Sequence, residues 1–455
     1  IDNDNMDNNA GTMLNSSVTV AGLNLDNLTV HQGGFAYLYN DMKPVSVFIK
    51  DNSTAYVNSN ITSDEVFVDM NSVMDLRSGY GFPSDMNLYL QNQSTLTHGY
   101  NTNNKTHFID LTLANLTIDA SSAINVSGKG YRWDEGPGAG GSSDYAGGGA
   151  GHGGLGSSGH GSSGGSVYGS LTDPFNLGSG GGTGGGERGG RGGGLVNLDV
   201  GNLYLEGSIV ADGLRGTTSD YDSGGGGSGG SININVGNLF GNGSMLTDGG
   251  IGGNSNSDDD DSGGGSGGRV YIKYNSNNFT GNIRAYGGSG KHDKDGGAGT
   301  IYLHDNVANK SYLEIDNDNM DNNAGTMLNS SVTVAGLNLD NLTVHQGGFA
   351  YLYNDMKPVS VFIKDNSTAY VNSNITSDEV FVDMNSVMDL RSGYGFPSDM
   401  NLYLQNQSTL THGYNTNNKT HFIDLTLANL TIDASSAINV SGKGYRWDEG
   451  PGAGG

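Results

Sequence analysis

A residue-for-residue internal repeat constrains this chain more than any other feature of its sequence. Residues 1–141 recur as residues 315–455, so the sequence repeats with a period of 314. The chain therefore holds one whole unit and the first part of the next. A long period is typical of repeat architectures, in which each copy adopts the same local structure. We expect the chain to be a window from a longer repetitive polypeptide.

Composition divides the chain into four parts. Residues 1–130 are rich in Asn, Thr and Ser, and residues 131–194 form a Gly-rich insertion. Residues 195–314 alternate short apolar runs with Gly-rich loops, and residues 315–455 are the second copy of 1–141. We interpret the first and third parts as one repeated fold whose loops lengthen into the Gly-rich segments.

The chain is strongly acidic and contains no cysteine. Asp and Glu number 47 against 21 Lys and Arg, which gives a net charge of −26. Nucleic acid is not an expected partner, because binding the phosphate backbone needs a basic surface. Without Cys there can be no disulfides, thiolate catalysis or cysteine-ligated zinc. No apolar run approaches the length of about 18 residues that a membrane-spanning helix needs, so we expect no such helix.

The short apolar runs alternate with a period of two residues, which predicts β-strands. Examples are residues 45–49, 66–68, 88–90 and 111–113. Such a strand buries every second side chain and exposes those between. No stretch sustains the spacing of an amphipathic helix, so we expect almost no helix.

The strands also recur at regular intervals. Leu25, Val47, Val68, Leu90 and Leu113 follow one another at spacings of 22, 21, 22 and 23. A solenoid coil of two or three short strands and their turns needs about 20–25 residues. These positions therefore predict coils whose inward apolar residues align in rows.

The second half repeats this theme at longer intervals. Residues 195–213 align without a gap on residues 231–249, at a spacing of 36. Residues 270–287 are a third copy, and a fourth begins at Ile301. We expect these segments to stack on one another.

The fold class that follows is all-β: a right-handed parallel β-helix, or solenoid, continuous across the tandem units. Its long Gly-rich loops are residues 128–194, 213–230, 249–268 and 287–299. Asn and Gly suit the corners because both tolerate left-handed backbone, and stacked Asn side chains can form hydrogen-bonded ladders. About ten coils at roughly 4.8 Å each would make one unit span about 48 Å.

A flexible linker is the default interpretation of the Gly-rich insertion. The alternative is ordered packing of bare backbone against the solenoid, which Gly permits because it lacks a Cβ atom. An apolar island inside the insertion favours some order; it comprises Val167, Tyr168, Leu171, Pro174, Phe175 and Leu177.

Asn-x-Ser/Thr sequons predict N-linked glycans. Residues 1–141 hold eight sequons where composition alone predicts about three, whereas the Gly-rich part is near its chance level. The candidate glycosylation sites are Asn15, Asn27, Asn52, Asn60, Asn92, Asn104, Asn115, Asn125, Asn242, Asn278, Asn309, Asn329, Asn341, Asn366, Asn374, Asn406, Asn418, Asn429 and Asn439. If these sites carry no glycan, their Asn residues remain candidate turn formers and ladder members.

Two acidic clusters are candidate Ca²⁺ ligands, because carboxylate oxygens suit this hard cation. The EF-hand spacing fails because Met6 occupies a ligand position and no Gly follows it, and the nonapeptide array of calcium-binding β-rolls is absent. Solvated acidic turns are the favoured interpretation, with a weak calcium site as the alternative and no other cofactor expected. The clusters are Asp2, Asp4 and Asp7, repeated as Asp316, Asp318 and Asp321, and residues 258–261.

A catalytic role is a further alternative, because parallel β-helices include pectin-degrading enzymes. Polygalacturonase-like enzymes use paired Asp residues, a Gly-His-Gly and a nearby basic residue. This chain has Gly-His-Gly at His152 and His160, acids at 258–261, and Arg269. The order is reversed and no Asn-Thr-Asp element is present, and acids in a Ser/Gly loop lack the rigid placement that acid–base catalysis needs. We predict no catalytic residues and no enzyme activity.

Aromatic residues fall at outward positions of the expected strands, at Phe48, Phe67, Tyr89, Tyr271 and Tyr302. One interpretation is a stacked ladder between adjacent coils. The other is a covered surface, the cover being the Gly-rich insertion, glycan sugars or a neighbouring filament.

Two phrases carry a resemblance to known proteins: GGGSGGRVYI at residues 263–272 and GGAGTIYL at residues 296–303. They resemble the glycine-rich, right-handed parallel β-helix repeats of large secreted surface proteins. Such repeats occur among microbial adhesin-like proteins and protist extracellular-matrix or flagellar-hair (mastigoneme-like) proteins. The resemblance covers residues 111–303; it implies an extracellular structural role and supplies no catalytic residues.

The expected function is the structural repeat unit of a secreted, N-glycosylated extracellular fibre. The unit would associate with itself, head to tail along the fibre, and carry covalent glycans. The alternative is the stalk of a cell-surface adhesin, and the third possibility is a polysaccharide-acting β-helix enzyme.

Overall fold

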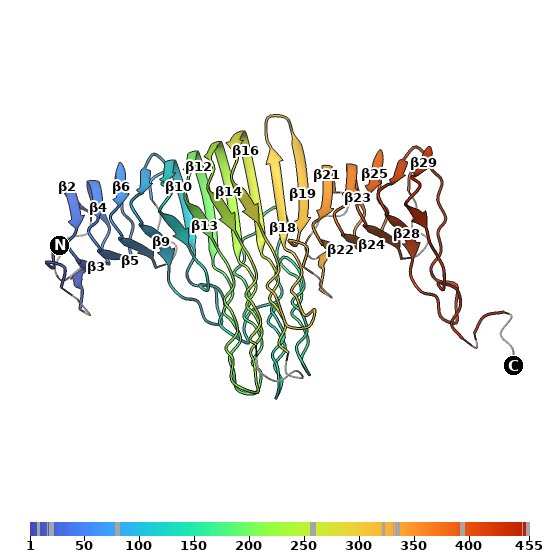
Figure 1. Ribbon diagram of the computed structural model, residues 1–455. Helices are drawn as coiled ribbons and strands as arrows, with labels where there is room; N and C mark the ends of the chain where they lie inside the picture. The colour runs from blue at the N-terminus through green and yellow to red at the C-terminus, as the bar shows by residue number, and fades with distance from the viewer. Residues whose placement is uncertain are drawn as a thin grey trace.

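The computed structural model describes residues 1–6, 10–15, 17, 22–77, 82–254, 261–320, 324–330, 332, 337–391, 396–447 and 449–451. This part of the chain contains thirty β-strands and no helix, which confirms the all-β expectation. The strands form one sheet of 15 strands and two smaller sheets of 9 and 6 strands. Figure 1 shows the coils following one another in chain order, with the N- and C-termini at opposite ends of the stack.

The long sheet runs through both units. Its strands are, in spatial order, β2 (Leu23–Val30), β4 (Met42–Ile49), β6 (Glu65–Val68), β8 (Asn87–Leu90), β10 (Ile109–Ile118), β12 (Leu195–Leu205), β14 (Ser231–Gly241), β16 (Arg269–Phe279), β18 (Thr300–Asp305), β19 (Lys310–Asp316), β21 (Leu337–His345), β23 (Met356–Ile363), β25 (Glu379–Val382), β27 (Asn401–Leu404) and β29 (Asn429–Ile432).

Each unit has its own side sheet. In the first unit it comprises β1 (Thr12–Leu14), β3 (Phe35–Leu38), β5 (Thr54–Val57), β7 (Val73–Leu76), β9 (Thr95–His98), β11 (Ala123–Asn125), β13 (Ser208–Val210), β15 (Ser244–Leu246) and β17 (Asn282–Arg284). In the second unit it comprises β20 (Thr326–Leu328), β22 (Phe349–Leu352), β24 (Thr368–Val371), β26 (Val387–Leu390), β28 (Thr409–His412) and β30 (Ala437–Ile438). The chain therefore passes from the long sheet to a side sheet and back in successive coils, as in a β-solenoid.

The pairing register of the first coils differs from the sequence prediction. Leu28 pairs with Val47, and Val47 pairs with Val66, so the first coils are shorter than the predicted spacing implies. The predicted Leu25 and Val68 partners of Val47 were wrong: the observed partner Leu28 lies three positions after Leu25, and Val66 lies two positions before Val68. Several apolar residues in each strand can occupy an inward position, so the apolar pattern alone did not fix the register.

Further along the long sheet, most of the predicted pairings are confirmed. In the first half the predicted pairing of Val68 with Leu90 is confirmed, but Leu90 pairs on its other side with Ile118 and not with the predicted Leu113. The predicted spacings of the second half are confirmed, and Val196 lies opposite Ile232 at the spacing of 36.

Turns of left-handed backbone connect the long sheet to the side sheets. The first residue of each of three successive turns, Asp51, Met70 and Asn92, has φ between 50° and 60°, and the residue after each also has positive φ. Asn and Asp tolerate this conformation because their short side chains can bond to the local backbone. The same turns recur in the second unit, stacking the corners of adjacent coils in a row that we call the turn row.

Asn side chains form the ladder that the sequence predicted. The Nδ2 group of Asn115 donates to Oδ1 of Asn87 at 2.6 Å, and Asn202 donates to Asn115 at 2.7 Å. Asn238 continues the row by donating to Asn202 at 2.8 Å. Each amide here bonds to the coil before it, so the ladder ties together four rungs of the long sheet.

The Gly-rich segments form an ordered bundle rather than a flexible linker. Gly182 donates its N–H to Gly148 at 2.9 Å, Gly225 donates to Gly182 at 2.9 Å, and Gly226 donates to Gly263 at 2.9 Å. These bonds connect the insertion to the loops of two later coils. A Cβ atom on Gly225 would lie 1.9 Å from the carbonyl oxygen of Gly148, so only Gly allows the backbones to approach this closely. Figure 1 shows these segments as long loops below the middle of the sheet.

The apolar island anchors the bundle. Leu171 and Leu177 are 1% and 0% exposed, and Tyr168 donates its hydroxyl to the carbonyl oxygen of Leu177 at 2.5 Å. Phe175 packs edge-on against Phe108, with ring centroids 5.4 Å apart. The alternative interpretation of the insertion, as ordered packing against the solenoid, is therefore confirmed.

The two units join through an antiparallel hairpin. Strand β18 runs parallel to β16, but β19 pairs antiparallel with β18, and β21 then runs parallel to β19. The long-sheet strands of the second unit therefore run opposite to those at the end of the first. This departs from the predicted parallel pairing throughout, because Ile301 begins a strand that turns back on itself instead of completing another coil.

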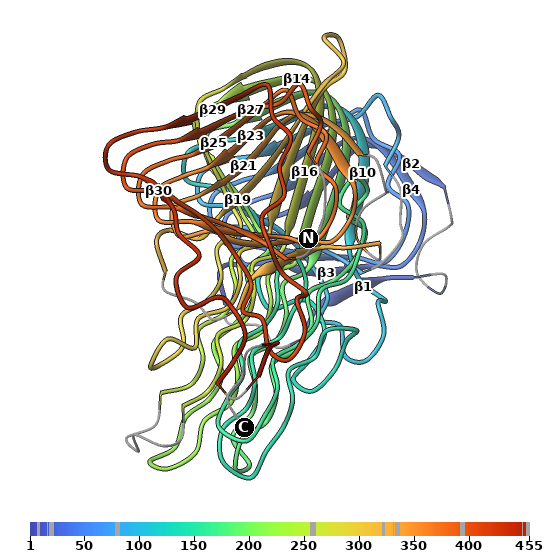
Figure 2. The ribbon, with the colours of Figure 1, turned by 90° about the vertical axis from the view of Figure 1, so that its right-hand side faces the viewer.

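The hydrophobic core changes face at this hairpin. Val270 and Ile301 belong to the core of the first unit, whereas Tyr302 and Leu313 belong to that of the second. Tyr302 pairs with Leu313, so both side chains lie on the face opposite to Ile301. Seen end-on in Figure 2, the long sheet extends from β2 and β4 on the right to β27 and β29 on the left.

Candidate functional site

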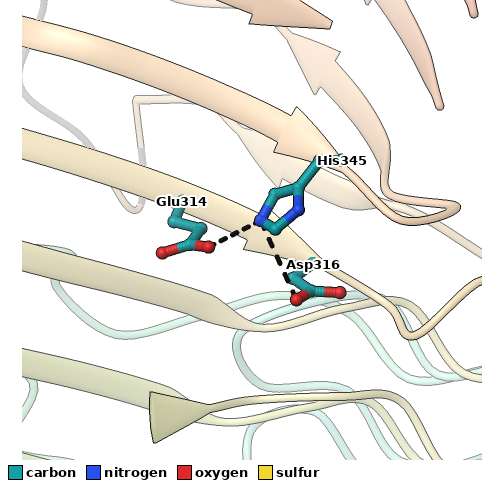
Figure 3. A group of neighbouring side chains, drawn as sticks. All are labelled: Glu314, Asp316 and His345. Atoms are coloured by element: carbon teal, nitrogen blue, oxygen red, sulfur yellow. Dashed lines mark hydrogen bonds and ion pairs between the residues drawn. The ribbon is translucent and has the colours of Figure 1, made fainter. Parts of the chain in front are cut away.

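Three ionisable side chains converge where the two units join. Glu314 and Asp316 lie two residues apart on β19, so their side chains share one face of the sheet. His345 ends β21 and pairs in register with Asp316. Figure 3 shows both carboxylates directed toward the imidazole ring. We call this group the junction triad.

The imidazole lies between the two carboxylates. Nε2 of His345 is 2.5 Å from Oε1 of Glu314 and 3.8 Å from Oδ2 of Asp316. Burial by itself lowers the pKa of His345, but the hydrogen bond to Glu314 and both negative charges outweigh it, so the net pKa is raised. Burial raises the pKa of Asp316. The arrangement can hold an imidazolium ion or a metal cation.

Neighbouring groups hold Asp316 in place. The backbone N–H of Asp318 donates to Oδ1 of Asp316 at 2.9 Å. The side chain of Gln346, with its amide nitrogen turned toward the carboxylate, lies 2.9 and 3.0 Å from the two oxygens. Oδ2 therefore remains directed toward His345.

The first unit contains the same arrangement without the Glu. His31 lies 3.8 Å from Asp2, and the N–H of Asp4 donates to Oδ1 of Asp2 at 2.9 Å. Gln32 stands beside Asp2 as Gln346 does beside Asp316. The Glu is the last residue of a unit and the Asp and His belong to the start of the next, so the triad requires one unit to follow another.

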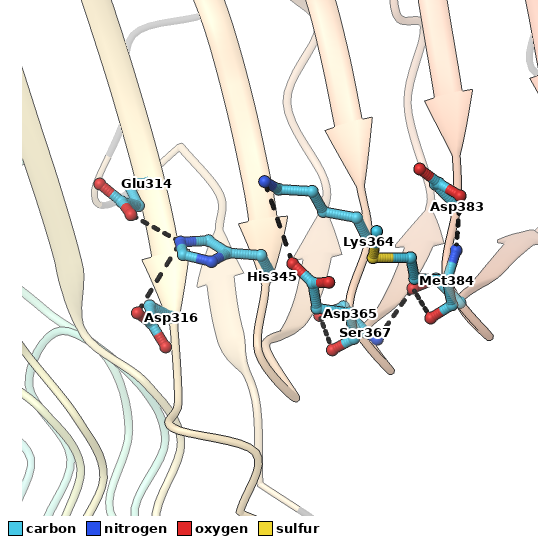
Figure 4. A network of polar contacts seen from close by, with 9 residues as sticks. Glu314, Asp316, His345, Lys364, Asp365, Ser367, Asp383 and Met384 are labelled. Atoms are coloured by element: carbon cyan, nitrogen blue, oxygen red, sulfur yellow. Dashed lines mark hydrogen bonds and ion pairs between the residues drawn. The ribbon is translucent and has the colours of Figure 1, made fainter.

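A second network of polar contacts lies beside the triad along the turn row of the second unit, as Figure 4 shows. Lys364 lies 3.9 Å from Asp365, whose carbonyl oxygen accepts a hydrogen bond from the Ser367 hydroxyl at 3.4 Å. The N–H of Met384 donates to Asp383 at 2.8 Å. A shallow groove of about 530 Å³ follows this row, and an equivalent groove of the same size follows the turn row of the first unit.

The predicted calcium clusters are only partly described by the structure. Asp316 belongs to the junction triad, but Asp7, Asp321 and residues 258–260 lie outside the described residues. Asp261 is buried and its carboxylate is 2.6 Å from Nδ1 of His292. Glu314 and His345 were not predicted as site residues, because only the pairing of β19 with β21 brings them together and no local sequence motif marks them.

The residues considered for catalysis are buried or separated. His152 and Arg269 are both 0% exposed, and Nη2 of Arg269 donates to the carbonyl oxygen of His152 at 3.3 Å. Arg269 also donates to the carbonyl oxygen of Tyr168 at 3.0 Å, so it ties two points of the Gly-rich insertion to β16. His160 lies elsewhere and stacks on Tyr145 at 5.1 Å. The hydrogen bonds of Arg269 therefore hold the Gly-rich insertion against β16.

The outward aromatic residues form stacked ladders. The rings of Phe48 and Phe67 are 5.2 Å apart, those of Phe67 and Tyr89 are 4.7 Å apart, and each pair is within 9° of parallel. Phe67 is therefore stacked on both of its faces, between the coil before it and the coil after it. Tyr271 and Tyr302 stack at 5.5 Å. This confirms the ladder interpretation, and Tyr302 is additionally covered by the core of the second unit.

Most candidate glycosylation sites are exposed. The half-buried Asn residues among them are Asn15, Asn115, Asn329 and Asn341. Asn52, Asn92, Asn309, Asn366 and Asn406 are exposed in turns with positive φ, where a glycan would project away from the sheet. Glycosylation at the predicted sites stays a prediction.

Comparison with known proteins identifies no relative. No family model matches the chain, and neither a curated protein sequence nor a solved structure matches it. The described residues include no helix long and apolar enough to cross a membrane.

Proposed function

We propose that the chain is the repeat unit of an extracellular protein filament and that its role is structural rather than catalytic. One observation carries the proposal: the long sheet passes from the first unit into the second without a break. Leu313 at the end of the first unit pairs with Leu342 at the start of the second. A repeated sequence that pairs in this way propagates one sheet along the whole polypeptide.

The proposed filament has a defined geometry. At the junction the strand direction reverses and the core moves to the other face of the sheet, while the stack advances in the same direction. These changes together equal a half-turn about the filament axis. We infer that each unit is a right-handed parallel β-helix and that consecutive units alternate by a half-turn, modified by the twist of the sheet.

The extracellular assignment rests on the sequons and on the resemblance to glycine-rich surface-fibre repeats. Exposed Asn residues in the turns give glycans room to project, and the net charge of −26 favours solubility of a long filament. Intact-mass measurement of material secreted from a eukaryotic host tests the glycans. A mass equal to that of the bare polypeptide would remove this part of the proposal.

Chains of one, two and four units, examined by small-angle X-ray scattering, test the filament itself. The expected result is a rod whose length grows by about 48 Å per unit, ten rungs at roughly 4.8 Å each. A radius of gyration that grows as it does for beads on flexible linkers would contradict the proposal, because the units would then not share a sheet.

A further inference from the structure

We propose that the junction triad binds a first-row divalent cation, with Zn²⁺ as the probe, through Glu314, Asp316 and His345. The site would form once at each junction between units. The inference does not depend on a filament role, because the present chain contains the whole triad.

The positions of the ligand atoms fit a zinc ion. The three atoms lie within 4.8 Å of one another. Ligand atoms of a tetrahedral zinc ion, at about 2.0–2.2 Å from the metal, are about 3.4 Å apart. The separations from Nε2 of His345, 2.5 Å to Glu314 and 3.8 Å to Asp316, bracket that value. Small side-chain rotations would seat the ion, and the fourth position would be left to water.

The surroundings restrict how the ligands move. Glu314 and Asp316 project from one strand at positions i and i+2, and His345 projects from the directly paired strand. Asp316 is further oriented by Asp318 and Gln346, as described above. Groups that orient a ligand in this way commonly change metal affinity by about 10–100-fold.

The donor set selects among cations. One imidazole nitrogen and two carboxylate oxygens suit zinc and its first-row neighbours. Calcium prefers six to eight oxygen ligands, so an imidazole at the centre of the group disfavours it. The proposal therefore replaces the weak calcium site with a site for a different class of cation.

Isothermal titration calorimetry of the 455-residue chain with ZnCl₂, in a buffer that does not chelate metals, tests the site. Glu314→Gln and His345→Gln each remove one ligand while conserving shape, and His31→Gln makes the matching change in the first unit. Circular dichroism and thermal unfolding show whether each variant keeps its fold. The expected result is one zinc per chain, bound at least about tenfold more weakly by the two junction variants and unchanged by His31→Gln.

Three outcomes would overturn the proposal. Zinc does not bind to the unaltered chain, or the junction variants bind it as well as the unaltered chain, or His31→Gln weakens it as much as His345→Gln. A parallel titration with CaCl₂ tests the selectivity, and calcium binding of equal strength would contradict the assignment of the cation class.

Discussion

Tyr302 pairs with Leu313 across the antiparallel strands β18 and β19, and both side chains lie in the core of the second unit. Tyr302 nevertheless belongs to the last strand pairing with the first unit, where Ile301 points into the first core. One strand therefore supplies both cores from its two faces. Because of this sharing, the two units meet as parts of one sheet rather than as beads on a linker.

Removing the Tyr302 side chain is expected to loosen the second unit more than the first. Tyr302 is 5% exposed, and truncating a buried aromatic residue to Ala costs about 3–5 kcal/mol. Tyr302→Ala should therefore raise amide hydrogen exchange in β19, β21 and β23. The matched control is Tyr204→Ala: Tyr204 stacks on Phe240 with ring centroids 5.0 Å apart but is 44% exposed, so its removal should cost less than about 1 kcal/mol. Equal exchange in the two variants would contradict a shared junction strand.

Met70 is expected to be a suboptimal residue in its turn. Its φ of 50° is left-handed, and its side chain is 51% exposed, so little packing compensates for the backbone. Asn adopts this conformation more readily, and Met70→Asn should stabilise the chain by about 0.5–1 kcal/mol in urea unfolding. Met13→Asn is the control, because Met13 is 49% exposed but lies in strand β1. A gain from Met13→Asn and none from Met70→Asn would rule out the backbone explanation.

His98 makes stability depend on pH in a defined direction. Burial lowers its pKa to about 3, and its neutral ring bonds to Gly99 through Nδ1 and accepts from Leu195 through Nε2. The unfolded chain binds a proton below about pH 6.5 that the folded chain does not, so this contribution is lost as pH falls from 6.5 toward 3. His98→Gln should therefore cost about 2 kcal/mol less at pH 5 than at pH 7.5.

The unfolding free energy of the unaltered chain is compared with that of His98→Gln at each pH, because other groups change the stability in the opposite direction as pH falls. Burial and the charge of Asp248 raise the pKa of Asp212 to about 7, so protonating Asp212 stabilises the fold as pH falls below that value. The difference between the unaltered chain and His98→Gln cancels this effect. If the cost of His98→Gln is the same at both pH values, the buried neutral His is not the cause.

A single added methyl group is expected to destabilise the Gly bundle. In Gly225→Ala the new Cβ would meet the carbonyl oxygen of Gly148 at 1.9 Å, which forces the segments apart. Overpacking of this kind costs about 1–3 kcal/mol or more. Gly444→Ala is the control in this 455-residue chain: a Cβ at Gly444 has no neighbour within 4 Å, whereas one at the equivalent Gly130 of the first unit would meet the carbonyl oxygen of Gly193 at 2.2 Å. Hydrogen exchange of the bundle amides should rise in Gly225→Ala alone, and equally slow exchange in both variants would contradict the close packing.

The pairing register could be predicted from the sequence where the repeated segments contain distinctive residues. The Gly201 and Gly237 segments align unambiguously, and their strands pair in that register. The early strands contain only alternating apolar residues, which are compatible with two registers, and the left-handed turns select between them. The apolar periodicity therefore predicts which side chains are buried, but it does not determine which strands pair or in which register.

The junction triad and the β18–β19 hairpin could not be predicted from the sequence, because both depend on contacts between strands. Residues 301–303 look like the start of another coil, and the β18–β19 hairpin depends on the turn at residues 306–309. Glu314 and His345 are far apart in the chain and meet because β19 pairs with β21. The sequence did not decide whether the Gly-rich insertion is flexible or ordered, because its order depends on hydrogen bonds between segments from different coils.

The central claim, that tandem units share one sheet and alternate by a half-turn, is tested most directly by cryo-electron microscopy of a chain of four or more units. The expected image is a continuous filament whose Gly bundles recur once per unit and return to an equivalent orientation after two units, about 96 Å, apart from the twist of the sheet. Bundles that keep one orientation in successive units, or units separated by gaps, would contradict it.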